Sequence, residues 1–301
     1  MAIKARDQVK WVTTTTSLEL EADTGEAILV KDILCNPVSN GYLTVSIDKT
    51  TVGYFRIDSG NLGSHLHFPL VDSEKLTLLG YLWNKGIFKG YPIAEGQKLV
   101  LTATSGITMA VQYDIYEPGD ISPDMENGSE AKEYMLINYG RKASSGNLSD
   151  GDNELVYCIL PSEFPDFPFG KDVPAKTVIE IYGILASDVG KTSGSGANKQ
   201  GTEYLKLVKE REVLFDEDKR GLLLIGYVSA SDATNVGSGT TVVGNYSSVD
   251  RRLPKLFDTP LKFESGEELS VILSTSVEAG SANIDVKYGE VAFIEKVIRT
   301  G

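Results

Sequence analysis

The two histidines of the chain are the first candidates for metal binding or acid–base catalysis. His65 and His67 lie two positions apart, so on a β-strand both side chains would point to the same face. A zinc site needs at least one more ligand of the right type, and none lies near them in the sequence. A catalytic Ser-His-Asp or Cys-His set would have to use one of these two residues, and the Gly-x-Ser-x-Gly motif is absent. We therefore predict no catalytic residues and no metal or cofactor here.

A Gly-Lys-Thr triplet at residues 190–192 resembles the end of a phosphate-binding loop. Leu185 stands where the first glycine of that motif belongs, and the residues that follow are rich in Ser and Gly rather than helix-forming. A phosphate would then lack the amide groups of a helix N-terminus. We interpret the triplet as a chance match.

An acidic turn places Asp150, Asp152 and Glu154 at alternate positions. Carboxylates in this spacing are possible Ca²⁺ ligands, but Pro161 occupies the position of the bidentate glutamate of an EF-hand. We interpret the turn as a hydrated loop, and the sequence leaves calcium binding open. No metal-ligating residue is predicted elsewhere.

Cysteine and tryptophan are scarce, with two of each. Cys35 and Cys158 lie far apart in apolar segments, which predicts two buried thiols rather than a disulfide. Trp11 and Trp83 are expected to pack in the core rather than to form a platform for sugar rings.

The charge and hydropathy of the chain exclude several classes of function. A net charge of −13 argues against direct binding of nucleic acid, which needs clustered Lys and Arg. No apolar run approaches the ~18 residues of a transmembrane helix, so no membrane span is expected. The first residues lack the apolar core of a secretory signal, which predicts synthesis in a cytoplasm or a mature form whose leader has been removed.

Apolar and polar residues alternate with a period of two in segment after segment. Residues 43–48 and 107–115 are clear examples, and strict alternation is typical of antiparallel strands with one buried face. The first 120 residues hold eight such segments and no helical stripe: 11–20, 27–35, 42–47, 52–57, 65–70, 76–83, 99–104 and 107–116. Dense strands without crossover helices predict an all-β fold, a sandwich or barrel.

The two halves of the chain share short segments in the same order. Three pairs carry the match: 76–82 with 222–228, 92–96 with 260–266, and 109–113 with 284–288. The second copy is longer at residues 187–202 and 229–259, which are rich in Gly, Ser, Thr and Asn, as loops are. We predict two tandem antiparallel β-sandwich, jelly-roll-like domains at residues 1–118 and 131–301, joined by an acidic linker at 119–130. Leu79 and Ile225 are predicted to be equivalent buried positions.

A duplicated eight-stranded sandwich of this length, with a short linker and longer loops in its second half, resembles the double-jelly-roll major capsid proteins of tailless icosahedral viruses. That resemblance implies a structural protein of the virion that associates with itself, as trimers with a pseudo-hexagonal outline. It implies a location in the virion after synthesis in the host cytoplasm, with other virion proteins as possible partners. A turret or spike protein built from jelly rolls fits the same pattern.

Two other classes of function remain open. β-Sandwiches also serve as carbohydrate-binding, lectin-like proteins, although tryptophan is scarce here. A β-sandwich enzyme is the third alternative. Among such enzymes a cupin-type metalloenzyme is the least favoured, because its metal site usually needs three histidines and the chain has two.

Overall fold

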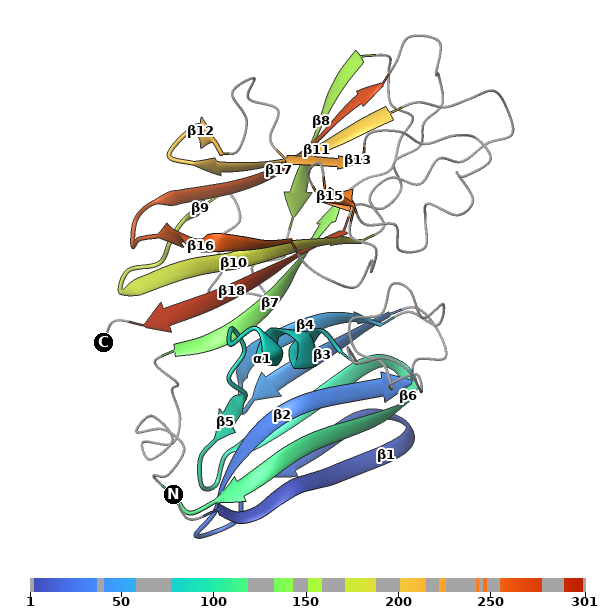
Figure 1. Ribbon diagram of the computed structural model, residues 1–301, viewed down its shortest axis with the longest axis vertical. Helices are drawn as coiled ribbons and strands as arrows, with labels where there is room; N and C mark the ends of the chain where they lie inside the picture. Colours follow the sequence, from blue (N-terminus) through green and yellow to red (C-terminus); the bar gives the residue numbers. More distant parts are fainter. Residues whose placement is uncertain are drawn as a thin grey trace. The chain divides into compact units, whose positions relative to one another are not determined.

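A computed structural model describes residues 3–36, 41–57, 77–118, 133–142, 151–158, 171–187, 201–214, 222–225, 242–243, 246–247, 255–277 and 290–299. This part of the chain is an all-β, antiparallel sandwich fold with one short helix (Figure 1). The chain divides into two compact units, Met1–Ile137 and Asn138–Thr300. The expected linker at 119–130 lies outside the described residues, and the division between the units falls a few residues beyond it.

The first unit is a single six-stranded sheet around the long strand β6. The strands follow the order β4-β3-β6-β2-β5, and β1 pairs with the remaining edge of β6. Their bounds, together with the helix, are β1 Ile3–Glu21, β2 Ala27–Asn36, β3 Gly41–Ile47, β4 Thr50–Ile57, α1 Leu78–Asn84, β5 Tyr91–Ile93 and β6 Lys98–Tyr116. Every pairing is antiparallel.

The sheet curls because β6 changes neighbours halfway along. Its first half pairs with β3 and its second half with β2, while β1 follows it on the other side (Figure 1). The register of β1 on β6 shifts between Val12 and Ser17, next to the positive φ of Thr14. Such bulges bend a strand. We predicted separate strands at 99–104 and 107–116, but they are one strand.

Alternation along the strands builds the core of the first unit. Leu99 and Leu101 of β6 are fully buried, as are Ile33 and Cys35 of β2. Cys35 is a buried cysteine, as predicted. The side chain of Cys158 lies outside the described residues.

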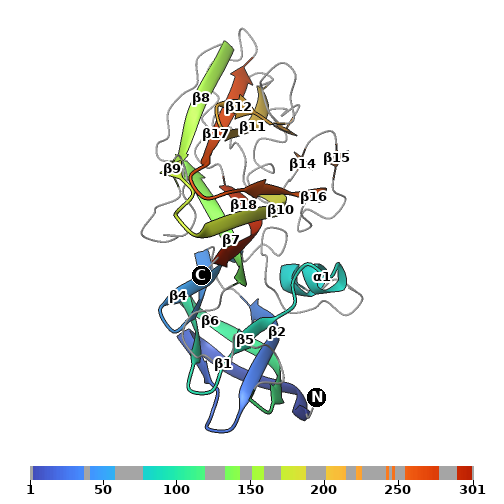
Figure 2. The ribbon, with the colours of Figure 1, turned by 90° about the vertical axis from the view of Figure 1, so that its left-hand side faces the viewer.

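The segment predicted as a strand at 76–83 is instead the helix α1, beside β2 (Figure 2). Leu78, Leu79 and Leu82 are its buried residues, and the spacing of Leu78 and Leu82 is one helical turn. Thr77 caps the helix, its hydroxyl accepting a hydrogen bond from the backbone N–H of Gly80 at 2.9 Å. A short apolar run fits a strand or a buried helix equally well, and here the cap and the leucine spacing favour the helix.

The second unit has more and shorter strands, the first of which, β7, crosses the division between the units. Their bounds are β7 Glu133–Lys142, β8 Gly151–Cys158, β9 Lys171–Asp172, β10 Thr177–Ser187, β11 Gly201–Lys209, β12 Glu212–Val213, β13 Leu222–Ile225, β14 Val242–Val243, β15 Tyr246–Ser247, β16 Lys255–Phe263, β17 Glu268–Val277 and β18 Glu290–Arg299. The main sheet has the order β12-β11-β17-β8-β7-β18-β10-β16, with β13 on β11 and β9 on β17. The long loops predicted at 187–202 and 229–259 fall largely outside the described residues.

This order repeats that of the first unit once broken strands are joined. β10, β11 and β16 have the neighbours of β2, β3 and β5, while β17 and β18 together replace β6. In the same way β7, β8 and β9 replace β1, and β12 and β13 replace β4. The second unit therefore repeats the strand order of the first, with its longest strands interrupted.

Local hydrogen bonds repeat with the strand order. The N–H of Gly96 donates to the carbonyl of Ala22 at 2.9 Å, and the N–H of Gly266 donates to that of Val173 at 2.9 Å. Both glycines have positive φ, 78° and 87°, the left-handed conformation that glycine adopts at least cost. These two turns belong to the matched segments 92–96 and 260–266.

The strongest sequence match is nevertheless wrong. Residues 78–82 lie in α1, whereas 222–225 are strand β13, which takes the place of β4 on β11. Leu79 is fully buried in a helix and is not equivalent to Ile225. The two segments agree in apolar composition, which does not distinguish a short helix from a strand.

Candidate functional site

Most of the residues singled out from the sequence lie outside the described part of the chain. This holds for His65, His67, Asp150 and the triplet 190–192. Asp152 and Glu154 lie on β8, but nothing is described of their side chains. Among the described residues, no group of three or more His, Cys, Asp or Glu is arranged to bind a metal ion. None of the described helices has the length and apolar content needed to cross a bilayer.

Both tryptophans are on the surface, contrary to the prediction that they pack in the core. Trp11 of β1 is 64% exposed and Trp83 of α1 is 38% exposed. β1 is an edge strand whose partner among the described strands is β6. Val9, two positions before Trp11 and hence on the same face, is 57% exposed. An apolar pair this exposed on a sheet edge marks a candidate interaction surface.

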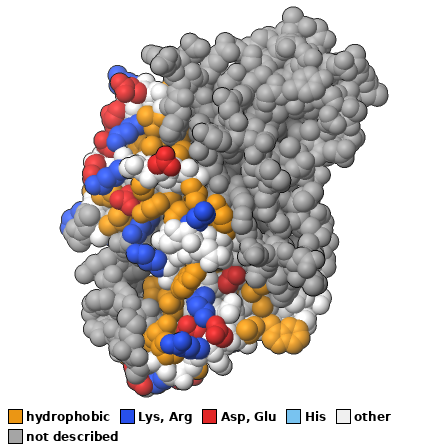
Figure 3. Space-filling model, in the orientation of Figure 1, with side chains coloured by type: hydrophobic (Ala, Val, Ile, Leu, Met, Phe, Trp, Pro, Cys, Tyr) orange, Lys and Arg blue, Asp and Glu red, His pale blue; other side chains and the backbone are white. Residues whose placement is uncertain are grey.

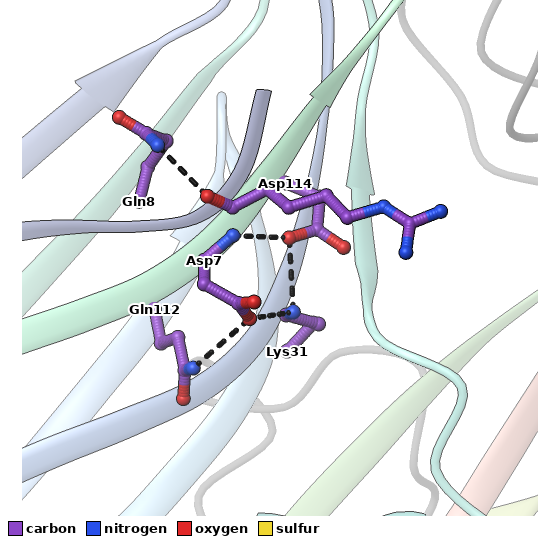
Figure 4. Close-up of polar contacts among 6 residues, drawn as sticks. Asp7, Gln8, Lys31, Gln112 and Asp114 are labelled. Carbon is purple, nitrogen blue, oxygen red and sulfur yellow. Dashed lines mark hydrogen bonds and ion pairs between the residues drawn. The ribbon is translucent and has the colours of Figure 1, made fainter. Parts of the chain in front are cut away.

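A cluster of charged residues lies beside this pair, where β1 and β2 both bulge (Figure 4). The ammonium of Lys31 contacts Oδ1 of Asp7 at 2.5 Å and Oδ1 of Asp114 at 2.9 Å. The backbone N–H of Asp7 donates to Oδ1 of Asp114 at 2.7 Å, and Gln112 donates to Oδ1 of Asp7 at 3.4 Å. Asp7 has a φ of 52°. Three strands are thus joined by one lysine.

The electrostatics of the cluster favour its charged form. The hydrogen bond and the charge of Lys31 lower the pKa of the exposed Asp7 carboxyl. Partial burial by itself lowers the pKa of Lys31, but its hydrogen bonds with Asp7 and Asp114 outweigh that effect and raise it. The lysine therefore stays protonated, and its role is to hold three strands together rather than to exchange a proton.

The next residue of the same bulge, Asp32, makes a second polar contact. Its Oδ1 accepts hydrogen bonds from the Thr77 hydroxyl at 2.6 Å and from the N–H of Ile33 at 2.8 Å. Asp32 is 9% exposed, and burial raises its pKa to about 6 against the opposing effect of these bonds. A Cβ on Gly80 would lie 3.4 Å from Oδ2, so the start of α1 packs directly on this carboxylate.

The candidate surface therefore consists of Val9 and Trp11, with the Asp7–Lys31–Asp114 cluster next to them. The apolar pair and the cluster are neighbours along the strands, because Val9 of β1 pairs with Gln112 of β6, and the side chain of Gln112 donates to Asp7. On the face shown in Figure 3, basic, acidic and apolar side chains of the described residues are interspersed. The candidate surface, an exposed apolar pair beside paired charges, suits specific contact with another macromolecule or with a polar ligand that has an apolar face.

The sequence reasoning missed this cluster, although one signal was present. Lys31 and Asp32 are consecutive charged residues within the otherwise apolar run of β2. Two charges in a row break the alternation of a strand and indicate a bulge. Asp7 and Asp114 carry no comparable signal, because Asp7 lies between polar residues and Asp114 occupies a regular polar position of an alternating strand.

Comparison with known proteins gives no family. No protein family matches the chain, and no curated protein matches it. A solved structure of an IolB-like protein from Salmonella typhimurium LT2 aligns over 97% of this chain and 81% of that chain, with 14% identity and a TM-score of 0.16. A similarity at that level bears on neither fold nor function.

Proposed function

We propose that this chain is a structural protein of a virion, a major capsid protein that associates with itself as trimers within an icosahedral shell. The observation that carries the proposal is the repeated strand order of the two units. Two copies of one sandwich in a single chain offer three molecules a way to surround an axis with a near-sixfold outline. Closed symmetric assembly is the usual state of proteins that associate with themselves.

The described residues add two supporting features. The exposed pair Val9 and Trp11 lies on β1, whose partner among the described strands is β6 alone, so another chain can meet its other side. The charged cluster at Asp7, Lys31 and Asp114 is internally paired, as expected of a structural link rather than of a catalytic site. In a shell these units would meet other virion proteins as well as copies of themselves.

Sedimentation velocity of the purified chain tests this proposal. The expected species is a trimer or a larger symmetric assembly that persists on dilution, because permanent interfaces bury well over ~1,000 Å². A monomer at every concentration and ionic strength would exclude a shell protein.

A carbohydrate-binding role is the second candidate, and the exposure of Trp11 favours it. An exposed indole can stack on the apolar face of a sugar ring, and neighbouring polar groups such as Gln112 and Asp7 are donors and acceptors for its hydroxyls. A glycan array separates the two proposals. Binding that is lost in Trp11→Ala and retained in Trp83→Ala would support the lectin role.

A further inference from the structure

We infer that the middle of β1 is a self-association edge, at which two copies of the chain pair antiparallel around a twofold axis near Trp11. The inference rests on the proposed function, since it names a contact by which neighbouring copies in a shell meet. A trimer supplies contacts around a threefold axis, and a closed icosahedral shell also has twofold axes between its building blocks.

The backbone of β1 is available for pairing over a short, regular stretch. Its residues from Gln8 to Val12 pair with β6 without a register shift, and β6 is its partner among the described strands. Asp7 and Thr14, with φ of 52° and 51°, lie just outside this stretch. A strand that is paired along one side presents the N–H and C=O groups of its other side to another strand. The two irregular residues limit that edge to the segment between them.

The same stretch carries the exposed apolar side chains. Of the three large hydrophobic residues exposed among the described residues, Val9 and Trp11 lie here and Trp83 lies on α1. In an antiparallel pair centred on Trp11, the two indoles face each other across the axis, and Val9 faces Thr13 of the second copy. Aromatic pairs across strands stabilise sheets.

Charge explains why the partner is a second copy and why it runs antiparallel. The first half of β1 carries Lys4, Arg6 and Lys10, whereas its second half carries Glu19 and Glu21. Antiparallel pairing over residues 8–12 brings the basic half of each copy alongside the acidic half of the other beyond the ends of the paired stretch, and parallel pairing would bring like charges together. This self-complementarity is what a twofold contact requires.

Ion pairs within the first unit reduce this asymmetry without removing it, since Lys4 lies 3.7 Å from Glu117 while Arg6 and Lys10 add positive charge to the first half. Lys31 pairs with Asp7, the one acidic residue in the basic half. Lys98 lies 3.0 Å from Glu19 and 3.8 Å from Glu21, so two carboxylates share one ammonium. The second half therefore keeps a net negative charge.

Charge reversal of the hydrophobic centre tests the contact. Sedimentation equilibrium of the full chain is compared for the wild type, Trp11→Glu and the matched control Trp83→Glu. We expect Trp11→Glu to weaken self-association at least tenfold, because two carboxylates would face each other at the axis, and Trp83→Glu to change it less than twofold. Equal association of the wild type and Trp11→Glu would overturn the inference.

Cross-linking gives a second measurement, which reports the geometry of the contact. Trp11→Cys in a Cys158→Ser background places a thiol opposite its own copy at the axis, within reach of a disulfide under mild oxidation. Lys85→Cys, exposed at the end of α1, is the control. The expected result is a covalent dimer with Trp11→Cys and none with Lys85→Cys.

The outcomes separate this inference from the proposed function. Assembly that persists in Trp11→Glu, with no cross-link through Trp11→Cys, contradicts the β1 contact and leaves the shell proposal standing. A wild type that is monomeric at every concentration contradicts both. A monomer that binds a glycan through Trp11 assigns this edge to a carbohydrate instead.

Discussion

The hydroxyl of Thr77 donates a 2.6 Å hydrogen bond to Oδ1 of Asp32 and so ties the start of α1 to the bulge of β2. The same hydroxyl oxygen accepts from the N–H of Gly80. The hydroxyl oxygen of Thr77 thus serves both the buried carboxylate of Asp32 and the N-terminal cap of α1. The helix docks over β2 only if both bonds are satisfied together, since an unpaired buried polar group is costly.

Stability of the first unit is predicted to rise as the pH falls from 7 to 4. The pKa of Asp32 is raised from 3.8 to about 6, so the folded state binds a proton more readily than the unfolded chain. The stabilisation that comes from protonated Asp32 is complete below the pKa of this residue in the unfolded chain, 3.8. It is lost as the pH rises through the pKa in the folded state, about 6. A shift of this size corresponds to about 3 kcal/mol at most. Denaturation followed by tryptophan fluorescence measures it, because both tryptophans lie in the first unit.

Asp32→Asn is the matched variant for this titration. The amide still accepts from Thr77 but carries no charge, so we expect a gain of about 1–3 kcal/mol at pH 7.5 and a flatter dependence on pH. Asp23→Asn, at an exposed carboxylate, is the control and should leave both unchanged. A slope that persists in Asp32→Asn would show that another group titrates.

Removing the Thr77 hydroxyl should destabilise the first unit. Thr77→Ala deletes the helix cap and leaves Asp32 with one bond fewer, which should cost about 1–3 kcal/mol. Thr77→Ser keeps the hydroxyl and should cost well under half as much. The same fluorescence assay compares them, and equal losses would contradict a role for the hydrogen bonds.

Truncation of Leu79 tests the packing of α1. Its side chain is fully buried, so Leu79→Ala should cost about 2–5 kcal/mol. Trp83→Ala, on the exposed side of the helix, should cost less. A loss below about 1 kcal/mol for Leu79→Ala would mean that α1 does not pack on the sheet.

A pair of turn substitutions tests whether the two units share one architecture. Gly25 and Lys176 both have positive φ, 76° and 60°, in turns closed by equivalent hydrogen bonds. Gly25→Ala should destabilise the first unit by about 1 kcal/mol, and Lys176→Gly should stabilise the second by up to about 1 kcal/mol. Differential scanning calorimetry resolves the two transitions. A loss of stability in Lys176→Gly would contradict the equivalence.

The fold class was predictable from the sequence, because alternation and turn residues act locally. The runs at 27–35 and 42–47 match β2 and β3 almost residue for residue. Helix α1 was not predicted, since an apolar run of this length has two solutions and tertiary packing decides between them. The continuity of β6 was also missed, because residues 104–106 resemble a turn in composition.

The candidate surface was much less predictable. Tryptophan is a highly buried residue type on average. The exposure of Trp11 follows from the place of β1 at the edge of the described sheet, which only the strand order reveals. The contacts of Lys31 join residues 24 and 83 positions away in the chain. Such links depend on which strands pair, and alternation within a strand carries no information about its neighbours.

Electron microscopy of the purified full chain tests the central claim most directly. The proposed shell role predicts uniform particles with threefold symmetry and a pseudo-hexagonal outline, or closed shells built from them. Fields of single two-unit molecules, unchanged by protein concentration or salt, would contradict it.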